Sequence, residues 1–152
     1  MIAFENTIVI DRRIEEVFAF VVDLPSLPKW NYYVLSVSPT SPKPGAVGST
    51  YRQIRKNDEQ DLRISRLEPN RLLVVETIPP SRPELRREIM FEAQGDSTRM
   101  IDTWQLEMGV PKLLEPLAAN RAKSGVRENL EKLKVLLESG KVTLQDGRSF
   151  SL

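Results

Sequence analysis

Apolar and polar residues alternate between Tyr32 and Met108, a period-two pattern that is typical of half-buried β-strands. Clusters of Pro, Gly, Asn and Asp interrupt the alternation and predict turns, including one at residues 57–60. An earlier strand ends in the apolar run at residues 8–10. We therefore expect seven strands, over residues 2–10, 32–38, 49–56, 61–67, 71–78, 85–93 and 98–108.

Two short helices are expected between the first two strands. Ile14, Val17, Phe18 and Val21 follow the spacing of one helical face, and Asp11 is placed to cap this helix. Prolines disfavour helical geometry in the residue before them, so the Pro-containing segment 24–28 ends the helix. A second short helix is predicted around residues 26–29.

A long helix is predicted from about residue 110 to residue 138. Pro116 should either kink its first turns or mark its true start, and Gly140 can end it. One narrow apolar stripe is formed by Ala119, Ala122, Val126, Leu130, Leu133 and Leu137. Beyond it, residues 141–152 are compatible with a small hairpin, a swapped strand or disorder.

Composition narrows the function classes. The 152 residues are 40% apolar and 28% charged with a net charge of +1, as in one soluble globular domain without a field that attracts nucleic acid. Absence of Cys and His removes thiol nucleophiles, the usual proton carrier near neutral pH and the main transition-metal ligands. No signal peptide or membrane span is recognisable. We expect a cytoplasmic protein with no metal, cofactor, nucleic-acid partner or integral membrane association, and with an undetermined oligomeric state.

The order of elements from Asp11 to Trp30 is distinctive. A strand, a capped helix, Asp23 and a Pro-x-x-Pro-x-Trp turn precede a G-x-x-G strand entry at Gly45 and Gly48. This order resembles the START-like, or Bet v 1-like (SRPBCC), superfamily, in particular its bacterial polyketide cyclase/dehydrase and lipid-transport branch. The resemblance covers roughly residues 2–138 and implies an α+β helix-grip fold, in which a curved seven-stranded antiparallel sheet wraps around the long C-terminal helix. We expect one ligand-binding domain over residues 1–140, followed by the tail at 141–152.

The last expected hairpin places an acid and a base on one apolar surface. In strand 98–108 the face that carries Met100, Asp102 and Trp104 is apolar apart from the carboxylate, so it should point toward the helix. A turn centred on residues 95–96 pairs Arg87 with Trp104, and pairs Phe91 and Ile89 of the same face with Met100 and Asp102. Arg87 then lies diagonal to Asp102.

Three interpretations of Arg87 and Asp102 remain open. They form a structural ion pair, because buried charges are normally paired. Alternatively, Arg87 stacks on Trp104 and orients an anionic or carbonyl group of a ligand. In the third interpretation Asp102 is a general acid or base, which makes it the one weak catalytic candidate.

The size of the residues along the helix stripe predicts a cavity. Ala119 and Ala122 leave space under residues 115–126, whereas the leucines fill the space under 130–137. The competing interpretation is that Trp104, Phe91 or Trp30 fills that space, because interiors pack tightly. Glu115 is either a second polar ligand contact or solvated. A turn at 57–60 would pair Tyr51, Gln53 and Arg55 with Arg66, Ile64 and Leu62.

The resemblance implies binding of a lipid, sterol-like or polyketide-like molecule. Our leading hypothesis is carriage or sequestration of a small hydrophobic or aromatic ligand; alternatives are a polyketide-type cyclase/aromatase in the same cavity and a protein-interaction module. No catalytic residue is carried over from the family. The candidate ligand-binding residues are Trp30, Tyr51, Ile64, Arg87, Ile89, Phe91, Met100, Asp102, Trp104, Glu115, Ala119, Ala122 and Val126.

Overall fold

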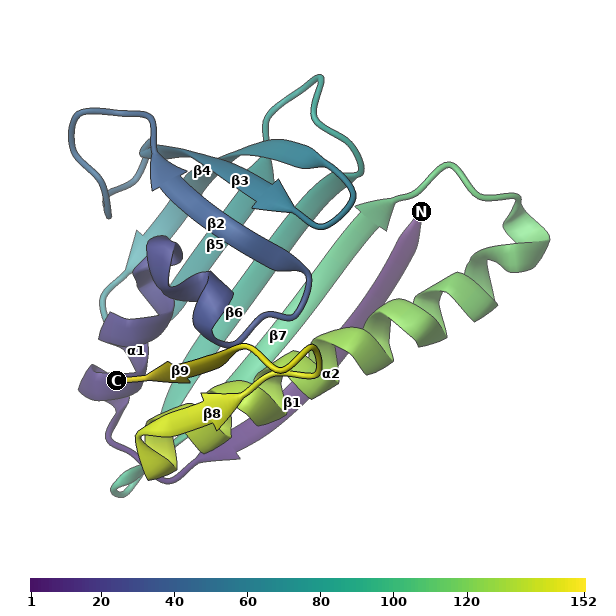
Figure 1. Ribbon diagram of the computed structural model, residues 1–152. Helices are drawn as coiled ribbons and strands as arrows, with labels where there is room; N and C mark the ends of the chain where they lie inside the picture. The colour runs from purple at the N-terminus through teal and green to yellow at the C-terminus, as the bar shows by residue number, and fades with distance from the viewer.

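A computed structural model describes residues 1–152 and contains a curved seven-stranded antiparallel sheet with the order β1-β7-β6-β5-β4-β3-β2 (Figure 1). The first strand therefore pairs with the last, and β1 and β2 form the two edges. Each strand ends within two residues of its predicted position. The strands are β1 (Ile2–Ile10), β2 (Val34–Pro39), β3 (Thr50–Arg55), β4 (Glu59–Glu68), β5 (Leu72–Thr77), β6 (Glu84–Gln94) and β7 (Ser97–Glu107).

Helix α1 (Ile14–Val22) and the 3-10 helix η1 (Leu24–Lys29) connect β1 to β2. Helix α1 buries the apolar face that its spacing predicts. The expected Asp11 cap is wrong: Arg13 occupies the N-cap position and no side chain caps the helix. A capping side chain must reach the second or third helical N–H, and Asp11 lies too far before the first turn. Its carboxylate instead accepts a hydrogen bond from the Ser97 hydroxyl at 3.0 Å.

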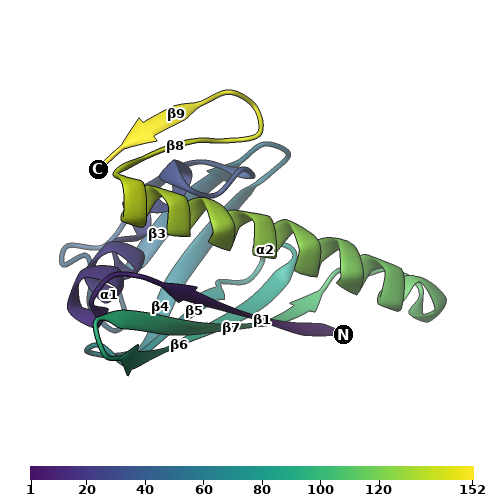
Figure 2. The same cartoon turned by 90° about the horizontal axis from the view of Figure 1, so that it is seen from below.

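Helix α2 (Glu115–Ser139) crosses the open side of the sheet, and its first turns project beyond the strand ends (Figure 2). A 3-10 turn, η2 (Lys112–Leu114), precedes it. Pro116 marks the start of the helix, where its missing N–H costs no hydrogen bond. Gly140 ends the helix at a φ of 85°, and its N–H donates to the Leu136 carbonyl at 2.8 Å. None of the helices combines the length and the apolar character needed to cross a bilayer.

Strand register was predicted correctly in one hairpin and wrongly in another. In β6–β7, Arg87 lies opposite Trp104 and Ile89 opposite Asp102, as expected. In β3–β4, Tyr51 lies opposite Leu62, and Gln53 opposite Gln60. The turn is formed by residues 56–58, because Gln60 belongs to the strand and faces inward. The shift is by an even number of residues, so the predicted inward faces are unchanged.

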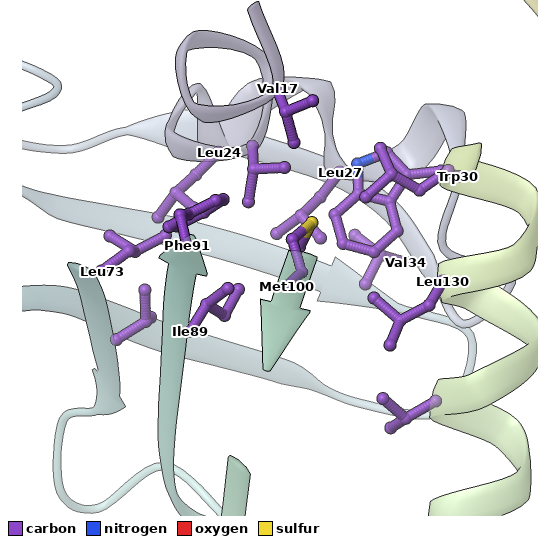
Figure 3. Packing of buried hydrophobic residues seen from close by; sticks show 14 of the residues in the cluster. Val17, Leu24, Leu27, Trp30, Val34, Leu73, Ile89, Phe91, Met100 and Leu130 are labelled. Carbon is purple, nitrogen blue, oxygen red and sulfur yellow. The ribbon is translucent and has the colours of Figure 1, made fainter. Parts of the chain in front are cut away.

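The hydrophobic core fills one end of the space between the sheet and α2. Figure 3 shows Met100 from β7 together with Trp30, which directly follows η1, and Leu130 from α2. Leu133 and Leu137 extend this core along the C-terminal half of α2, and all these side chains are almost completely buried. The second half of the helix thus packs against a solid core, as the leucine spacing predicts.

The tail forms a two-stranded hairpin, β8 (Lys141–Thr143) and β9 (Ser149–Ser151). It folds back along α2 on the side away from β1 (Figures 1 and 2). Val142 and Leu144 pack with Leu136 in a small second apolar cluster. At the turn, the Asp146 carboxylate accepts hydrogen bonds from Lys56 Nζ at 2.9 Å and from Arg148 Nε at 2.8 Å.

Asp146 should make the folded protein more sensitive to acid. The hydrogen bond from Lys56, together with those from the backbone and side chain of Arg148, lowers the pKa of Asp146 from 3.8 to about 2. A carboxyl group with a lower pKa in the folded state contributes stability above its unfolded pKa, and this contribution is lost as the pH falls through the folded pKa. We expect Asp146→Asn to flatten the fall in melting temperature between about pH 4 and pH 2. Parallel melting profiles for the two proteins over this range would contradict the assignment.

Candidate functional site

A cavity of about 510 Å³ lies between the sheet and the N-terminal half of α2. Its walls come from η1, the start of β2, the inward faces of β3 to β7 and residues 114–126. Of its 28 lining residues 20 are hydrophobic, so most of the wall can interact only with apolar groups. This is the position that the small residues of the helix stripe predict.

Small residues on α2 create the space. Ala118, Ala122 and Gly125 line the cavity, where leucines at equivalent positions would reach the sheet. The predicted wall residue Ala119 is wrong in detail: it is partly buried against the core and does not line the cavity. Successive helical residues are rotated by about 100°, so residue 119 lies at the margin of the face whose centre is formed by residues 118, 122 and 125.

Arg87 and Asp102 form a bidentate ion pair in the cavity wall. Arg87 Nε donates to Asp102 Oδ1 at 2.9 Å, and Nη2 donates to Oδ2 at 2.6 Å. The arginine residue is 8% exposed, whereas Asp102 is fully buried. Of the two, only Arg87 lines the cavity, because the carboxylate lies behind it. The structure thus brings together the acid and the base that the strand pattern places on one face.

Two tryptophans flank the guanidinium. Arg87 Cζ lies 4.7 Å from the centroid of the Trp104 ring and 5.6 Å from that of Trp30, within the range of cation–π attraction. Both rings line the cavity, and both indole Nε1 atoms are buried without a hydrogen-bond partner. Neither tryptophan fills the space, so the competing interpretation of a filled interior is wrong.

The pairing geometry favours the first two interpretations of Arg87 and Asp102 over the third. Both carboxylate oxygens accept hydrogen bonds from the guanidinium, and the carboxylate does not line the cavity. A general base must lie within hydrogen-bond reach of the proton that it removes. Arg87 has three further N–H hydrogens without a protein partner, so this buried residue can donate hydrogen bonds to a group in the cavity.

Asp102, Ala119 and Glu115 do not line the cavity, and the other ten predicted site residues divide into two groups. Those that line the cavity are Trp30, Arg87, Ile89, Trp104, Ala122 and Val126. Tyr51, Ile64, Phe91 and Met100 face inward but are buried in the core instead. Phe91 packs edge-on against Phe18, and the Tyr51 hydroxyl accepts a hydrogen bond from the Gly45 N–H at 2.7 Å. For these four residues the inward direction was predicted correctly, but α1, η1 and the Gly45 loop cover the side chains.

Glu115 does not line the cavity. Its carboxylate forms an ion pair with the N-terminal ammonium of Met1 at 3.3 Å, beside a second pair with Glu107 at 3.4 Å. The hydrogen bond that this ammonium group donates to Glu115 is the main cause of its raised pKa. Glu115 therefore joins the ends of β1 and α2 rather than contributing to the cavity.

Several lining residues were not predicted. Gln60 receives a hydrogen bond from Gln53 at 2.9 Å and donates to the Arg82 carbonyl at 3.0 Å, which forms a polar patch on the wall. Its alternation with Leu62 was the signal that could have placed it in the strand. Asn31 and Tyr33 line the wall beside η1, but they lie in an irregular segment where no periodicity indicates direction.

The family model that describes "Polyketide cyclase / dehydrase and lipid transport" matches residues 1–138. The chain belongs to this family. Among curated proteins, none matches the chain. Membership in the polyketide cyclase/dehydrase and lipid-transport family, together with the cavity, suggests a ligand-binding or polyketide cyclase role.

Solved structures show the same fold. A START superfamily protein from Mycobacterium smegmatis is 14% identical, with a TM-score of 0.75 and coverage of 90% of this chain and 97% of that one. SSP2350 from Staphylococcus saprophyticus is 21% identical, with a TM-score of 0.70 and coverage of 95% and 96%. BexL, a di-domain ARO/CYC protein of the BE-7585A biosynthetic pathway, is 11% identical, with a TM-score of 0.71 and coverage of 95% and 50%. At these identities the likeness shows the helix-grip fold of the family alone.

Proposed function

We propose that the chain binds a small hydrophobic or aromatic molecule in the cavity between the sheet and α2, and carries or sequesters it. The observation that supports this most directly is a largely apolar cavity of about 510 Å³ whose wall includes three arginines, of which Arg87 is the buried one. A cavity of this size lies within the range of small-molecule sites. Burial of the ligand's apolar surface would contribute about 25 cal/mol per Å².

Arg87 would orient the ligand. Its bond to Asp102 fixes the guanidinium plane and uses two of its five N–H donors, so the remaining donors can reach a ligand oxygen. The Asp102 carboxylate already balances the guanidinium charge, so a neutral carbonyl or phenol oxygen would bind without leaving an unpaired buried charge. Trp30 and Trp104 contribute aromatic surface to the wall that an aromatic ligand can contact.

Native mass spectrometry of the freshly purified protein tests the proposal. We expect a reproducible extra mass that is lost on denaturation and whose identity gives the ligand class. If the protein carries no ligand, a thermal-shift screen of lipids and aromatic polyketide-like compounds follows. A ligand at 100 times its Kd would add about 2.7 kcal/mol of stability. A clean mass together with a silent screen would contradict the proposal and favour the protein-interaction alternative.

Filling the cavity should abolish binding. Ala122→Phe places a phenyl ring in the space beside Arg87 and Trp104, and we expect at least about a tenfold loss of affinity for any retained ligand. Asn120→Phe is the matched control, because residue 120 is exposed on α2 and does not line the cavity. The comparison uses titration calorimetry together with melting temperatures. Equal affinities for the two folded variants would place the binding site elsewhere.

A polyketide-type cyclase or aromatase is the second candidate. It is favoured by the family match and by two groups in the cavity wall, Arg87 and Tyr33, that can donate hydrogen bonds to a carbonyl oxygen. Incubation with a poly-β-ketone thioester mimic distinguishes it from carriage. Cyclised product formed faster than in buffer, and lost in Ala122→Phe, would favour the enzyme, whereas unchanged recovered ligand would favour carriage.

A further inference from the structure

Beside η1, the wall of the cavity is formed by the irregular segment at residues 31–34, which contacts α2. Residues Asn31, Tyr33 and Val34 line the cavity from this side, and Arg121, Ala122 and Gly125 line it from the helix. The Tyr33 ring approaches the helix so closely that a Cβ added at residue 125 would lie 3.0 Å from the Tyr33 hydroxyl oxygen. Gly125 thus makes room for Tyr33, which bridges the two sides of the wall.

The tail hairpin anchors this segment from outside. The Arg148 guanidinium donates through Nη2 to the Tyr32 carbonyl at 2.9 Å and through Nη1 to the Val34 carbonyl at 3.3 Å. The two carbonyls flank Tyr33, whose own carbonyl accepts a hydrogen bond from the Lys56 N–H at 3.0 Å. A planar guanidinium presents its donors in a fixed fork, so one side chain restrains both ends of the Tyr33 backbone.

The charged side chains of Asp146 and Lys56 help to hold the Arg148 guanidinium in place. Asp146 accepts from Arg148 Nε at 2.8 Å and pairs with Lys56, whose Nζ lies 4.1 Å from the centroid of the Tyr32 ring. Arg148 is therefore positioned by its own hairpin before it reaches the wall. The family match ends at residue 138, so Asp146 and Arg148 lie outside the part that the chain shares with the family model, whereas the residues that they contact lie within it.

We propose that Arg148 is a positioning residue that holds Tyr33 against α2, so that the tail hairpin sets how readily a ligand passes between residues 31–34 and the helix. The anchoring itself is independent of what the cavity holds. Its consequence for ligand passage rests on the proposed function.

Two variants test the anchoring. Arg148→Met removes the fork and keeps most of the stem, and Lys141→Met removes the same charge from an exposed side chain of the same hairpin that has no ion-pair partner. Amide hydrogen exchange is measured in both. We expect exchange of residues 32–34 to rise about tenfold in Arg148→Met, because charge-assisted hydrogen bonds to their backbone are lost. Lys141→Met should match the wild type, and β6–β7 should be unchanged in both.

Dissociation of N-phenyl-1-naphthylamine, a neutral aromatic probe that fluoresces in apolar surroundings, tests the consequence for passage. Phosphatidylcholine vesicles in excess, which carry a lipid-linked energy-transfer acceptor, trap the released probe and quench its fluorescence in a stopped-flow experiment. We expect about tenfold faster release from Arg148→Met and wild-type release from Lys141→Met. In a Tyr33→Ala background, Arg148→Met should add little, because a residue that acts through Tyr33 loses its effect when that ring is absent.

Each outcome separates the two proposals. Unchanged exchange of residues 32–34 in Arg148→Met overturns the anchoring. The role in passage is overturned if Arg148→Met raises the exchange of residues 32–34 but leaves the rate of probe release unchanged. It is also overturned if the effects of Arg148→Met and Tyr33→Ala on the release rate are fully additive. A wild-type protein that does not bind the probe counts against the proposed function, while the exchange result still supports or overturns the anchoring by itself.

Discussion

Replacing Arg87 with alanine should lower the free energy of unfolding by about 3–5 kcal/mol, because it leaves the fully buried Asp102 carboxylate without its partner. An unpaired buried charge keeps its desolvation cost and loses the attraction that offsets it. Urea denaturation at neutral pH measures the change. A loss of less than about 1 kcal/mol, the range of exposed ion pairs, would contradict a buried pair.

The double replacement Arg87→Met with Asp102→Leu is the control. It removes both charges and fills a similar volume with apolar groups, so stability should return close to the wild type. The same variant separates stability from function. If the pair serves only the fold, the double variant retains a bound ligand; if Arg87 orients the ligand, affinity falls although the protein is stable. The two interpretations that the geometry favours thus give opposite results in one folded protein.

Local periodicity predicts the register and the inward face of the β6–β7 hairpin, but only some of the residues that line the cavity. Arg87 and Trp104 share a face because the pleat alternates and the turn at Gly95 fixes the register. The β3–β4 turn contains no glycine that defines the register. Residues 57–60 are all compatible with a turn, so the prediction placed Gln60 outside the strand to which it belongs.

Contacts with helices and loops from elsewhere in the chain explain the remaining differences between the predicted and the observed lining of the cavity. Met100 and Phe91 point inward as their alternation predicts, yet α1 and η1 cover them, and a strand pattern contains no information about which helix covers which end. Likewise Ala118 and Ala119 are the same residue type, and only the rotation of α2 in the assembled fold decides which lines the cavity. Arg148 reaches Tyr32 across 116 positions of sequence, a contact that no local pattern encodes.

The second large effect is a difference in the free energy of unfolding between variants in the two halves of α2, because residues 114–126 line the cavity and residues 130–137 pack in the core. Leu133 is fully buried in the solid core, and Leu133→Ala should cost about 2–5 kcal/mol, the lost transfer free energy plus the cost of a new cavity. Val126 lines a cavity that already exists, so Val126→Ala should cost only the transfer term, about 1–2 kcal/mol.

Urea denaturation of both variants checks this contrast through the transition midpoint at constant slope. Leu133→Ala removes one carbon more than Val126→Ala, which accounts for only about 0.8 kcal/mol of the difference. A difference no larger than this would mean that the two halves of α2 pack alike, and the cavity would then be an unfilled part of an ordinary core. A larger difference would mean that the stability of this fold is concentrated at residues 130–137, which leaves residues 114–126 free to be shaped for a ligand.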